Sequence, residues 1–515
     1  MLKRLTITTA LLASALAAMQ SLATEPMSLQ WETEVHAGAG GGNFAPYYIA
    51  SGHDGISGVS PYTAYARASA QRQMSDSTRF SYGFGADLMA GYVSPIEYLR
   101  RDPETGTDYK HSVTSGYIYL QQLWGEVKWR SLFVTAGIKR YDRGLHNSSL
   151  GSGDYVLSTN ARPIPQVRVG FIDFQDVPLT NGWLQVRGEL AYGKFIDGGW
   201  IEDQYNRYNY FTTTGAWFHH KSFYLRVGGH QPFTATVGIQ HAVQFGGTNK
   251  KYRKGEEISS THIKSGFSQF IKSFLPTRGE GSDFYDGNHV GAWDVRLRYR
   301  LHSGATLSAY CQFPWEDGSG IGKLNGWDGI WGVEYEAAQP GIVDNVVAEY
   351  IDFTNQSGPM HWAPGDFPGT NIPNEATGAD DYYNNYLYDG WSNYGMSIGS
   401  PFVMSPAYNL DGYPRYTANR LRGFHIGIGG TPAPGWQYRL LVSHRTSWGT
   451  PFIPLPHRRH DTSMMAEATW QVTSVPGLSL TGAFAFDHGK LYGNNTGASI
   501  SVQYSGSLTF KRDKR

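Results

Sequence analysis

The chain has 515 residues, and its 43 lysines and arginines balance its 43 aspartates and glutamates. This balance gives no sign of the basic surface that nucleic-acid binding requires, so nucleic acid is not an expected partner. Aromatic residues make up 14% of the chain, yet the mean hydropathy is only −0.40, which excludes a bundle of membrane-spanning helices. A large β-structure can still form a single unit at this length.

The first 23 residues have the pattern of a secretory signal peptide. Lys3 and Arg4 precede an apolar stretch over 5–19, and a small-x-small site ends at Ala23, after which we expect cleavage. A retained membrane anchor is the alternative, but the apolar core is short for one. Since Cys311 is the only cysteine, the exported protein is expected to have no intrachain disulfide.

Apolar and polar residues alternate repeatedly from Trp31 to the C-terminus. Between Phe80 and Tyr92 every second residue is apolar, and the same alternation runs through 184–192, 293–301 and 498–510. These runs reach about 10 residues, longer than the ~5–6 of soluble sheets and suited to a tilted crossing of ~25 Å of hydrocarbon.

Alternation alone would also allow a soluble β-sandwich. The residue types on the two faces of these strands favour a membrane barrel instead. Aromatic residues lie near the ends of the apolar faces, as in the interfacial girdles of barrels. The opposite face of 293–301 carries Arg296, Arg298 and Arg300. These arginines could face a watery lumen but not lipid. We expect them to pair with nearby carboxylates, although a cationic lumen stripe is possible.

We therefore predict an all-β fold: a transmembrane antiparallel β-barrel of about 18 strands, spanning 24–510 and followed by a basic tail at 511–515. The remaining strands are expected near 31–38, 62–72, 117–130, 132–140, 166–172, 222–229, 233–245, 305–313, 330–338, 346–353, 422–430, 436–445, 464–472 and 478–487.

The expected connections come in two sizes. Tight turns are predicted at 129–132 and 229–232, and barrels of this class place short turns on the periplasmic side and long loops outside. A short amphipathic helix is predicted within 258–275, with its apolar face in the barrel mouth. The long loops are expected at 141–165, 246–291, 354–396 and 401–420.

Five segments resemble one family. LSTNARPIPQ at 157–166 resembles the hallmark of the capsule-assembly Wzi family, and so does RFSYGFGADL at 79–88. The resemblance runs from about Val35 to Phe510. The other three segments are similar to Bacteroidetes-type members: NHVGAW at 288–293, DGIWG at 328–332 and DFTNQSGP at 352–359.

The resemblance implies a monomeric outer-membrane barrel of ~18 strands that binds exported capsular polysaccharide and helps it assemble at the cell surface. It also implies a lumen blocked by loops and no enzymatic activity. The chain departs from the family in two places. Only Thr24 to Gln30 precede the first expected strand, so we do not expect the N-terminal periplasmic helical bundle of enterobacterial members. Phe510 is followed by KRDKR, whereas barrel chains commonly end on an aromatic residue.

Asn160 and Arg162 are the first candidates for binding glycan. Pro163 and Pro165 stiffen the segment that presents them. The guanidinium could clamp a uronate carboxylate or a pyruvyl group of an acidic capsule. Alternatively, it pairs with a lumen carboxylate and holds the loop inside the barrel.

The segment 380–391, DDYYNNYLYDGW, combines the aromatic faces and polar groups that sugar sites need. The alternative is an aromatic plug that packs in the barrel mouth, and nearby His361 and Trp362 could join either arrangement. The candidate glycan-binding residues of this segment are Asp381, Tyr382, Tyr383, Asn384, Asn385, Tyr386 and Trp391.

No catalytic or metal-binding pattern stands out. H-E-x-x-H does not occur, G-x-S-x-G occurs once, as GMSIG at 395–399, and His219-His220, His444, His457 and His460 lack acidic partners at ligand spacing. The basic run 249–254 could meet an anionic glycan or lipopolysaccharide phosphates, or it could be a solvated loop. We expect no cofactor, no metal and no enzymatic activity, with polysaccharide, outer-membrane lipids and lipopolysaccharide as partners. A diffusion channel is the main alternative, and a barrel hydrolase with a triad assembled in space is a further one.

Overall fold

The computed structural model describes residues 27–112, 116–142, 144–274, 287–358, 361–362, 376–377 and 380–510. The predicted signal peptide and the basic tail lie outside these residues. Among the described residues, no helix is long and apolar enough to cross a membrane.

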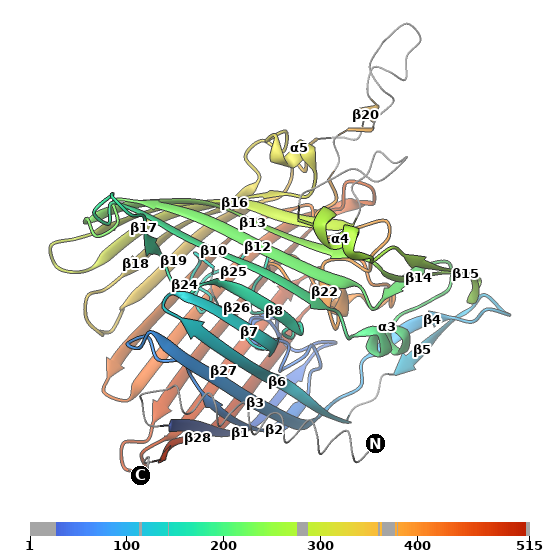
Figure 1. The fold of residues 1–515 in the computed structure, drawn as a ribbon. Helices are drawn as coiled ribbons and strands as arrows, with labels where there is room; N and C mark the ends of the chain where they lie inside the picture. The colour runs from blue at the N-terminus through green and yellow to red at the C-terminus, as the bar shows by residue number, and fades with distance from the viewer. Residues whose placement is uncertain are drawn as a thin grey trace, which may run out of the picture.

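The chain forms a closed antiparallel β-barrel (Figure 1). Its sheet contains 19 strands, of which the short β9 (Gln175–Asp176) lies beside β10 in line with β8. Counting β8 and β9 as one interrupted strand gives 19 − 1 = 18 barrel strands, the number predicted. The first strand pairs with the last, from Met27 opposite Phe510 to Gly41 opposite Thr496, and this pairing closes the barrel.

Each of the 18 predicted strands is present. The nine in the first half are β1 (Met27–Gly41), β2 (Thr63–Arg72), β3 (Phe80–Val93), β6 (Gly116–Trp129), β7 (Leu132–Ile138), β8 (Gln166–Phe171), β10 (Leu184–Lys194), β12 (Trp217–Val227) and β13 (Phe233–Phe245). The nine in the second half are β16 (Asn288–Arg300), β17 (Thr306–Trp315), β18 (Gly329–Glu336), β19 (Asn345–Asp352), β24 (Leu421–Ala433), β25 (Trp436–Gly449), β26 (Pro454–Gln471), β27 (Leu478–Gly489) and β28 (Asn495–Phe510).

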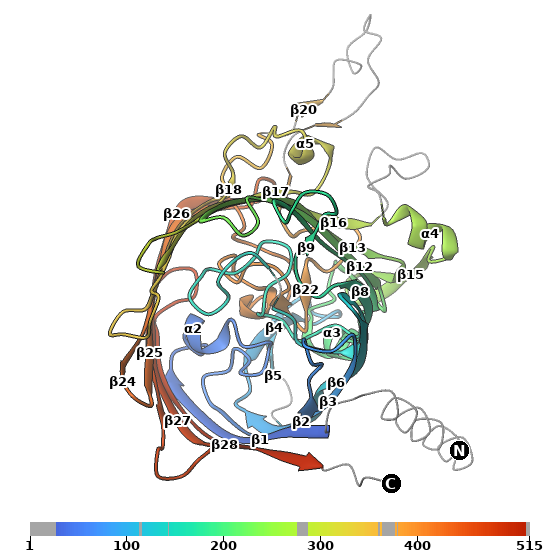
Figure 2. The same ribbon diagram turned by 60° about the vertical axis from the view of Figure 1, so that its left-hand side comes forward.

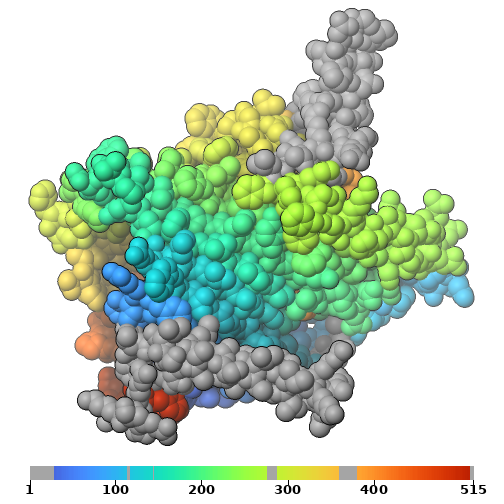
Figure 3. Space-filling model, viewed as in Figure 1, coloured from blue at the N-terminus to red at the C-terminus, as the bar shows by residue number. Residues whose placement is uncertain are grey.

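The outer face of the barrel is apolar, as the alternation predicts. Successive side chains of a strand point to opposite faces, and on β3 the apolar Leu88 and Tyr92 are exposed outside while Asp87 is buried inside. The outward face of β28 carries exposed Ile500, Tyr504 and Phe510 in the same way. Figure 3 shows the outer face of the wall around β8 to β16 as one continuous surface.

The inner face is polar and crossed by ion pairs. Arg67 on β2 contacts Asp87 on β3 at 2.7 Å and also reaches Glu32 and Glu34 on β1 at 3.3 Å. Arg296 pairs with Glu334, and Arg298 lies 3.7 Å from Glu336, so the predicted pairing of the β16 arginines is confirmed for these two. These contacts tie neighbouring strands together.

The two ends of the barrel differ. At the end that holds both Met27 and Phe510, the strands are joined by turns of two to eight residues, including 130–131 and 228–232 near the predicted tight turns. Arg130 adopts a φ of +56° in the first of them. We call this the turn end and the opposite end the loop end. The loop-end connections are 42–62, 94–115, 139–165, 195–216, 246–287, 316–328, 353–420, 450–453 and 490–494.

The loop-end connections contain short elements outside the barrel sheet. The hairpins are β4 (Glu97–Arg101) with β5 (Asp108–Ser112), β14 (Gly247–Arg253) with β15 (Glu256–Ile263), β20 (His361–Trp362) with β21 (Ala376–Thr377) and β22 (Ser392–Asn393) with β23 (Met396–Ser397). The rest are β11 (Phe211–Thr214), α2 (Tyr47–Ala50), α3 (Gly198–Gln204), α4 (Phe267–Lys272), α5 (Gly318–Ile321) and η2 (Pro406–Tyr408).

The helix predicted within 258–275 is correct only in its second half. Residues 256–263 form β15, because Lys254 and Gly255 both have positive φ and build a two-residue hairpin turn. The helix α4 lies outside the barrel ring (Figure 2), with Phe267 82% exposed and Phe270 packed on Trp217. Its apolar side therefore does not fill the barrel mouth.

Three loops fold into the barrel and fill its loop end (Figure 2). We call their described residues, 42–62, 144–165 and 380–420, the plug. Tyr155, Trp391 and Phe402 of the plug are fully buried and belong to one hydrophobic core with wall residues that include Val290 and Ile330. Polar contacts also attach the plug to the wall: Tyr47 N donates to Asp487 at 3.0 Å, and Ser152 N donates to Glu349 at 2.7 Å.

Candidate functional site

A cavity of about 320 Å³ lies at the loop end, between the plug and the neighbouring loops. The end of β6, the loop 139–165, α3 and the β22–β23 hairpin all contribute to its lining. The lining side chains with aromatic or polar groups include Tyr98, Tyr117, Tyr119, Arg162, Trp200, Asp203, Gln204, Asn393 and Tyr394.

Arg162 lines this cavity and contacts two of its aromatic rings. Its guanidinium carbon lies 3.9 Å from the ring centroid of Tyr119 and 4.2 Å from that of Tyr394, so the cation is held between two rings. Among the described residues no carboxylate lies within 4.0 Å of it. The structure therefore replaces the predicted alternative of a lumen ion pair with two cation–π contacts.

A tight hairpin turn presents Tyr394. Tyr394 and Gly395 have φ of +50° and +73°, the signature of a type I′ turn between β22 and β23. Gly395 also packs against Trp200, since a Cβ there would lie 2.3 Å from the indole ring. The turn thus places Tyr394 and Trp200 at one wall of the cavity, with ring centroids 6.3 Å apart.

Two buried polar residues hold this wall in place. Asp197, just before α3, accepts a hydrogen bond from Tyr394 N at 3.1 Å, and burial raises the pKa of its carboxyl to about 6. Asn393 donates to Arg162 O at 2.8 Å, while its Oδ1 has no hydrogen-bond partner within the described residues. An unpartnered buried acceptor beside a cavity is available to a ligand donor.

The cavity therefore combines aromatic rings, a fixed cation, a carboxylate and amides. Aromatic faces suit the C–H side of a sugar ring, and planar polar groups suit its hydroxyls. The two rings contact the Arg162 guanidinium, whose N–H groups match a carboxylate in geometry.

Asn160, the second residue predicted from this loop, has a structural position. It is fully buried, donates to Ser397 O at 2.9 Å and accepts from Gly52 N at 3.1 Å. These bonds join the three plug loops to one another. Asn160 and Arg162, two positions apart, therefore face the plug interior and the cavity respectively.

The predicted aromatic segment 380–391 lies mostly inside the plug. Tyr382, Tyr383 and Trp391 are fully buried, so their ring faces are not available to a sugar in this structure. Tyr382 donates to Asp328 at 3.0 Å, and Trp391 Nε1 donates to Val156 O at 2.8 Å. The geometry matches the alternative of an aromatic plug, and a glycan-binding role for these three residues stays a prediction.

The other predicted residues of this segment surround that core. Asp381 accepts hydrogen bonds from Asn384 at 3.1 Å and Asn419 at 2.6 Å. Asn385 accepts from Leu387 N at 2.9 Å, as in a local turn. Tyr386 is 51% exposed and is the one aromatic ring of the described segment that is open to solvent.

The remaining candidates from the sequence have different outcomes. Lys250 of the basic run lies 3.5 Å from Glu202 and 3.7 Å from Glu257, on an exposed hairpin. The side chains of His361 and Trp362 lie outside the described residues. Sequence reasoning missed Tyr119, Trp200 and Tyr394; the Asn393-Tyr394-Gly395 turn was the available signal for the last.

The fold has known counterparts among solved structures. The structure of Wzi, an outer-membrane protein involved in group 1 capsule assembly in Escherichia coli and described as a carbohydrate-binding β-barrel, matches with a TM-score of 0.52. The sequences are 11% identical, and the match covers 93% of this chain and 85% of that chain. The outer-membrane barrel fold is shared with the family that the five sequence segments resemble.

Two further structures match less well. OccAB2 of Acinetobacter baumannii has a TM-score of 0.46 at 10% identity, covering 93% of this chain and 98% of that chain. OccK5 (OpdH) of Pseudomonas aeruginosa has a TM-score of 0.44 at 9% identity, covering 94% and 98%. No family model matches the chain, and no curated protein matches it in sequence.

Proposed function

We propose that this chain is a non-catalytic outer-membrane protein of the Wzi type that binds surface polysaccharide and assists the assembly or attachment of a capsule. The observation that carries the proposal is the loop-end cavity, in which Arg162 is held between Tyr119 and Tyr394. The described carbohydrate binding of the Wzi barrel supports the same reading.

The apolar outer face supports a location in the outer membrane. Exposed aliphatic and aromatic side chains cover the wall, and a closed barrel leaves no unpaired strand edge in lipid. Short turns then face the periplasm and the loop end faces the cell exterior. In this orientation a monomer inserted among lipids and lipopolysaccharide opens its cavity toward exported polymer.

The cavity chemistry favours an acidic polysaccharide. A guanidinium that contacts two aromatic rings can still donate from its N–H groups, and a uronate or pyruvyl carboxylate accepts two parallel hydrogen bonds from such a group. Tyr394 and Trp200 would then pack against neighbouring sugar rings. Asp203 and Asn393 offer acceptors to hydroxyl groups.

The plug argues against the alternative of an open diffusion channel. Its buried tyrosines and tryptophan form one core with the inner wall, and a solute would have to displace that core to pass. We therefore expect purified protein in a planar bilayer to be electrically silent. Steady open-pore currents from the unmodified protein would favour the channel instead.

The proposal is tested by glycan binding to the purified barrel. Arg162→Ala should lower affinity for an acidic capsular polysaccharide at least tenfold, because Arg162 is the one cation among the described residues that line the cavity. Tyr394→Ala should weaken binding through lost stacking, while Tyr109→Ala, an exposed tyrosine outside the cavity lining, serves as the control. Equal binding by all three variants would contradict the cavity as the site.

A cellular experiment tests the wider role. Deleting the gene in an encapsulated host should release polysaccharide into the medium, and the Arg162→Ala allele should reproduce part of that release. Unchanged cell-bound capsule after deletion would contradict a role in attachment. Mass analysis of lipids and glycan incubated with the protein tests the absence of hydrolysis, and turnover would refute the non-catalytic assignment.

A further inference from the structure

A second polar cluster lies deeper in the lumen, where the plug meets the wall. His146 and Asp154 come from the loop 139–165, and Asp294 points inward from β16. One potential ligand atom of each residue lies within 4.8 Å of those of the other two. Asp154 and Asp294 are almost fully buried, and the side chain of His146 is 5% exposed.

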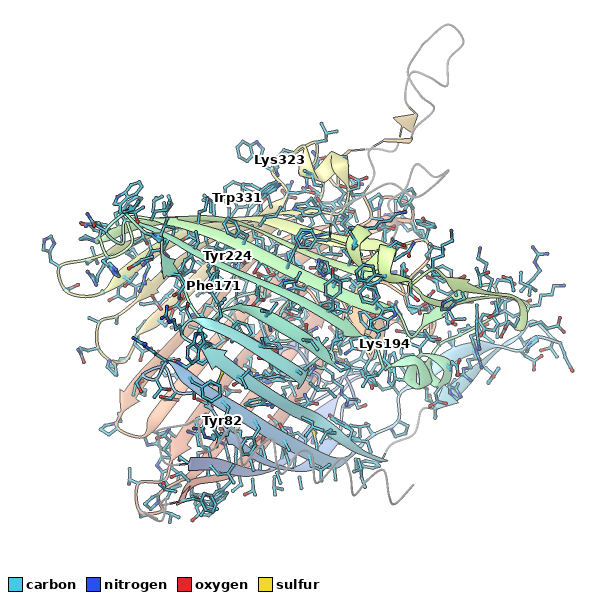
Figure 4. All side chains as sticks on the ribbon, viewed as in Figure 1. Tyr82, Phe171, Lys194, Tyr224, Lys323 and Trp331 are labelled. Carbon is cyan, nitrogen blue, oxygen red and sulfur yellow. The ribbon has the colours of Figure 1, made fainter. Side chains whose placement is uncertain are left out.

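The hydrogen bonds of the two carboxylates leave their charge uncompensated. Gln240 donates to Asp154 at 2.7 Å and to Asp294 at 2.9 Å, and Gln312 donates to the same two carboxylates at 2.9 and 2.8 Å. Tyr224, labelled in Figure 4, donates to Asp294 at 3.3 Å. All of these donors are neutral, and within the described residues no lysine or arginine lies within 4.0 Å of either carboxylate. Two buried negative charges held together by neutral amides are costly unless a cation joins them.

The imidazole of His146 faces the same carboxylates, and a proton on this ring or a bound cation can balance their charge. Its Nε2 lies 3.7 Å from Asp294 Oδ1, too far for a hydrogen bond, and its Nδ1 has no hydrogen-bond partner in the described part of the chain. Tyr310 packs edge-on against the ring with centroids 4.8 Å apart and fixes its orientation. A buried imidazole beside two carboxylates, with spacing beyond hydrogen-bond length, matches donors that surround an ion.

We propose that His146, Asp154 and Asp294 bind a divalent transition-metal ion of the Zn²⁺ class, which cross-links the plug to the barrel wall. One imidazole nitrogen and two carboxylate oxygens form a set that Zn²⁺ accepts. Zn²⁺ holds such donors at about 2.0–2.2 Å, so ligand atoms around it lie roughly 3–4 Å apart, and small side-chain movements suffice here.

The surroundings supply access and a second shell. A cavity of about 50 Å³ is lined by both His146 and Asp154, together with Tyr141 and Asn160, and gives an ion and its water a place beside the triad. Gln240 and Gln312 orient the carboxylates, as outer-shell partners of metal ligands do. The ion would join loop residues 146 and 154 to strand residue 294, which lie far apart in the sequence.

The test is metal titration of the purified full-length barrel in detergent at neutral pH, after treatment with EDTA. Calorimetric titration with Zn²⁺ should give one ion per chain, confirmed by elemental analysis. His146→Ala and Asp154→Asn should each weaken binding at least tenfold. His230→Ala is the matched control, because His230 lies 3.8 Å from Asp176 in an exposed pair that should hold no ion.

A spectroscopic readout separates ligation from indirect effects. Co²⁺ substitution should give visible ligand-field absorption in the unmodified protein, and His146→Gln should change the band pattern even where some affinity remains. Failure of the unmodified protein to bind Zn²⁺ stoichiometrically would overturn the proposal regardless of how the variants fold. Equal binding by the unmodified protein and by folded His146→Ala and Asp154→Asn would overturn it as well.

Discussion

The barrel wall and the plug are built from similar residues but follow different rules. In the wall, the position of a residue along its strand decides whether it meets lipid or lumen: Leu88 is exposed outside, and the adjacent Asp87 is buried inside. In the plug, burial does not alternate along the chain: the adjacent Tyr382 and Tyr383 are both fully buried, whereas Tyr386 is half exposed. Periodicity therefore determines environment in the wall, whereas in the plug environment depends on contacts between distant loops.

The largest expected effect comes from a substitution in the centre of the plug, which tests whether the plug can be destabilised while the wall stays folded. Trp391→Ala should destabilise the plug by about 3–5 kcal/mol, the usual cost of deleting a buried tryptophan, while the hydrogen-bonded wall stays closed. We expect faster amide exchange throughout 380–408 and intermittent currents in planar bilayers. Tyr386→Ala is the control, and loss of the folded barrel in Trp391→Ala would show that wall and plug are not separable.

The converse change introduces a charge on the lipid face. Val237 is exposed on the outer face of β13, with Leu225 and Val295 opposite on the neighbouring strands. Val237→Arg should cost about 2–4 kcal/mol if the residue lies near the bilayer midplane. The folded fraction on unheated gels should fall, whereas Val237→Leu should behave like the unmodified protein. Normal insertion of the arginine variant would argue against lipid contact at this position.

A smaller change tests one hydrogen bond of the plug. Tyr383 donates to Tyr155 O at 2.5 Å, and its oxygen accepts from Ser400 N at 3.0 Å. Tyr383→Phe keeps the ring but leaves two buried backbone groups without a partner, which should cost about 1–3 kcal/mol. Amide exchange at Ser400 should accelerate by the corresponding factor while exchange in β13 is unchanged.

The subtlest expected effect is a pH dependence confined to the plug region. Burial raises the pKa of Asp328, which accepts from Tyr382, to about 6, and it also raises the pKa of Glu316. A raised carboxyl pKa favours the protonated form in the closed plug, so this stabilisation is complete below about pH 4 and is lost as the pH rises through about 6. Thermal release of the plug, followed by tryptophan fluorescence, should therefore occur at a lower temperature at about pH 8 than at about pH 5. Asp328→Asn should flatten this difference, and an unchanged slope would assign it to other groups.

Most of the wall could be predicted from the sequence, because one rule governs it: lipid-facing and lumen-facing residues alternate along each strand. All 18 strands were predicted, as were the polar inner face and the arginine pairs of β16, since lipid permits only one arrangement of side chains. The loops 42–62, 94–115 and 195–216 were not recognised as long connections. The 256–263 segment was mistaken for helix because its apolar spacing outweighed the Lys254-Gly255 turn signal.

The candidate site was less predictable for the same reason. Arg162 was identified from its stiff proline-flanked loop, and the structure places it at the cavity. Its two aromatic partners, however, come from β6 and from a hairpin more than 200 positions away, and no local sequence pattern predicts contacts between such distant residues. The segment 380–391 has the composition of a sugar site, but composition cannot distinguish rings that bind a ligand from rings that bind one another.

The pairing of β1 with β28 sets a condition on biogenesis. Fifteen residue pairs join strands that lie more than 450 positions apart, so this seam can form only when the final strand is available. A chain truncated before Asn495 would leave the edges of β1 and β27 bare, each a template for another β-strand. We expect such a product to aggregate or to be captured by quality-control proteases, even though 17 of its 18 strands are intact.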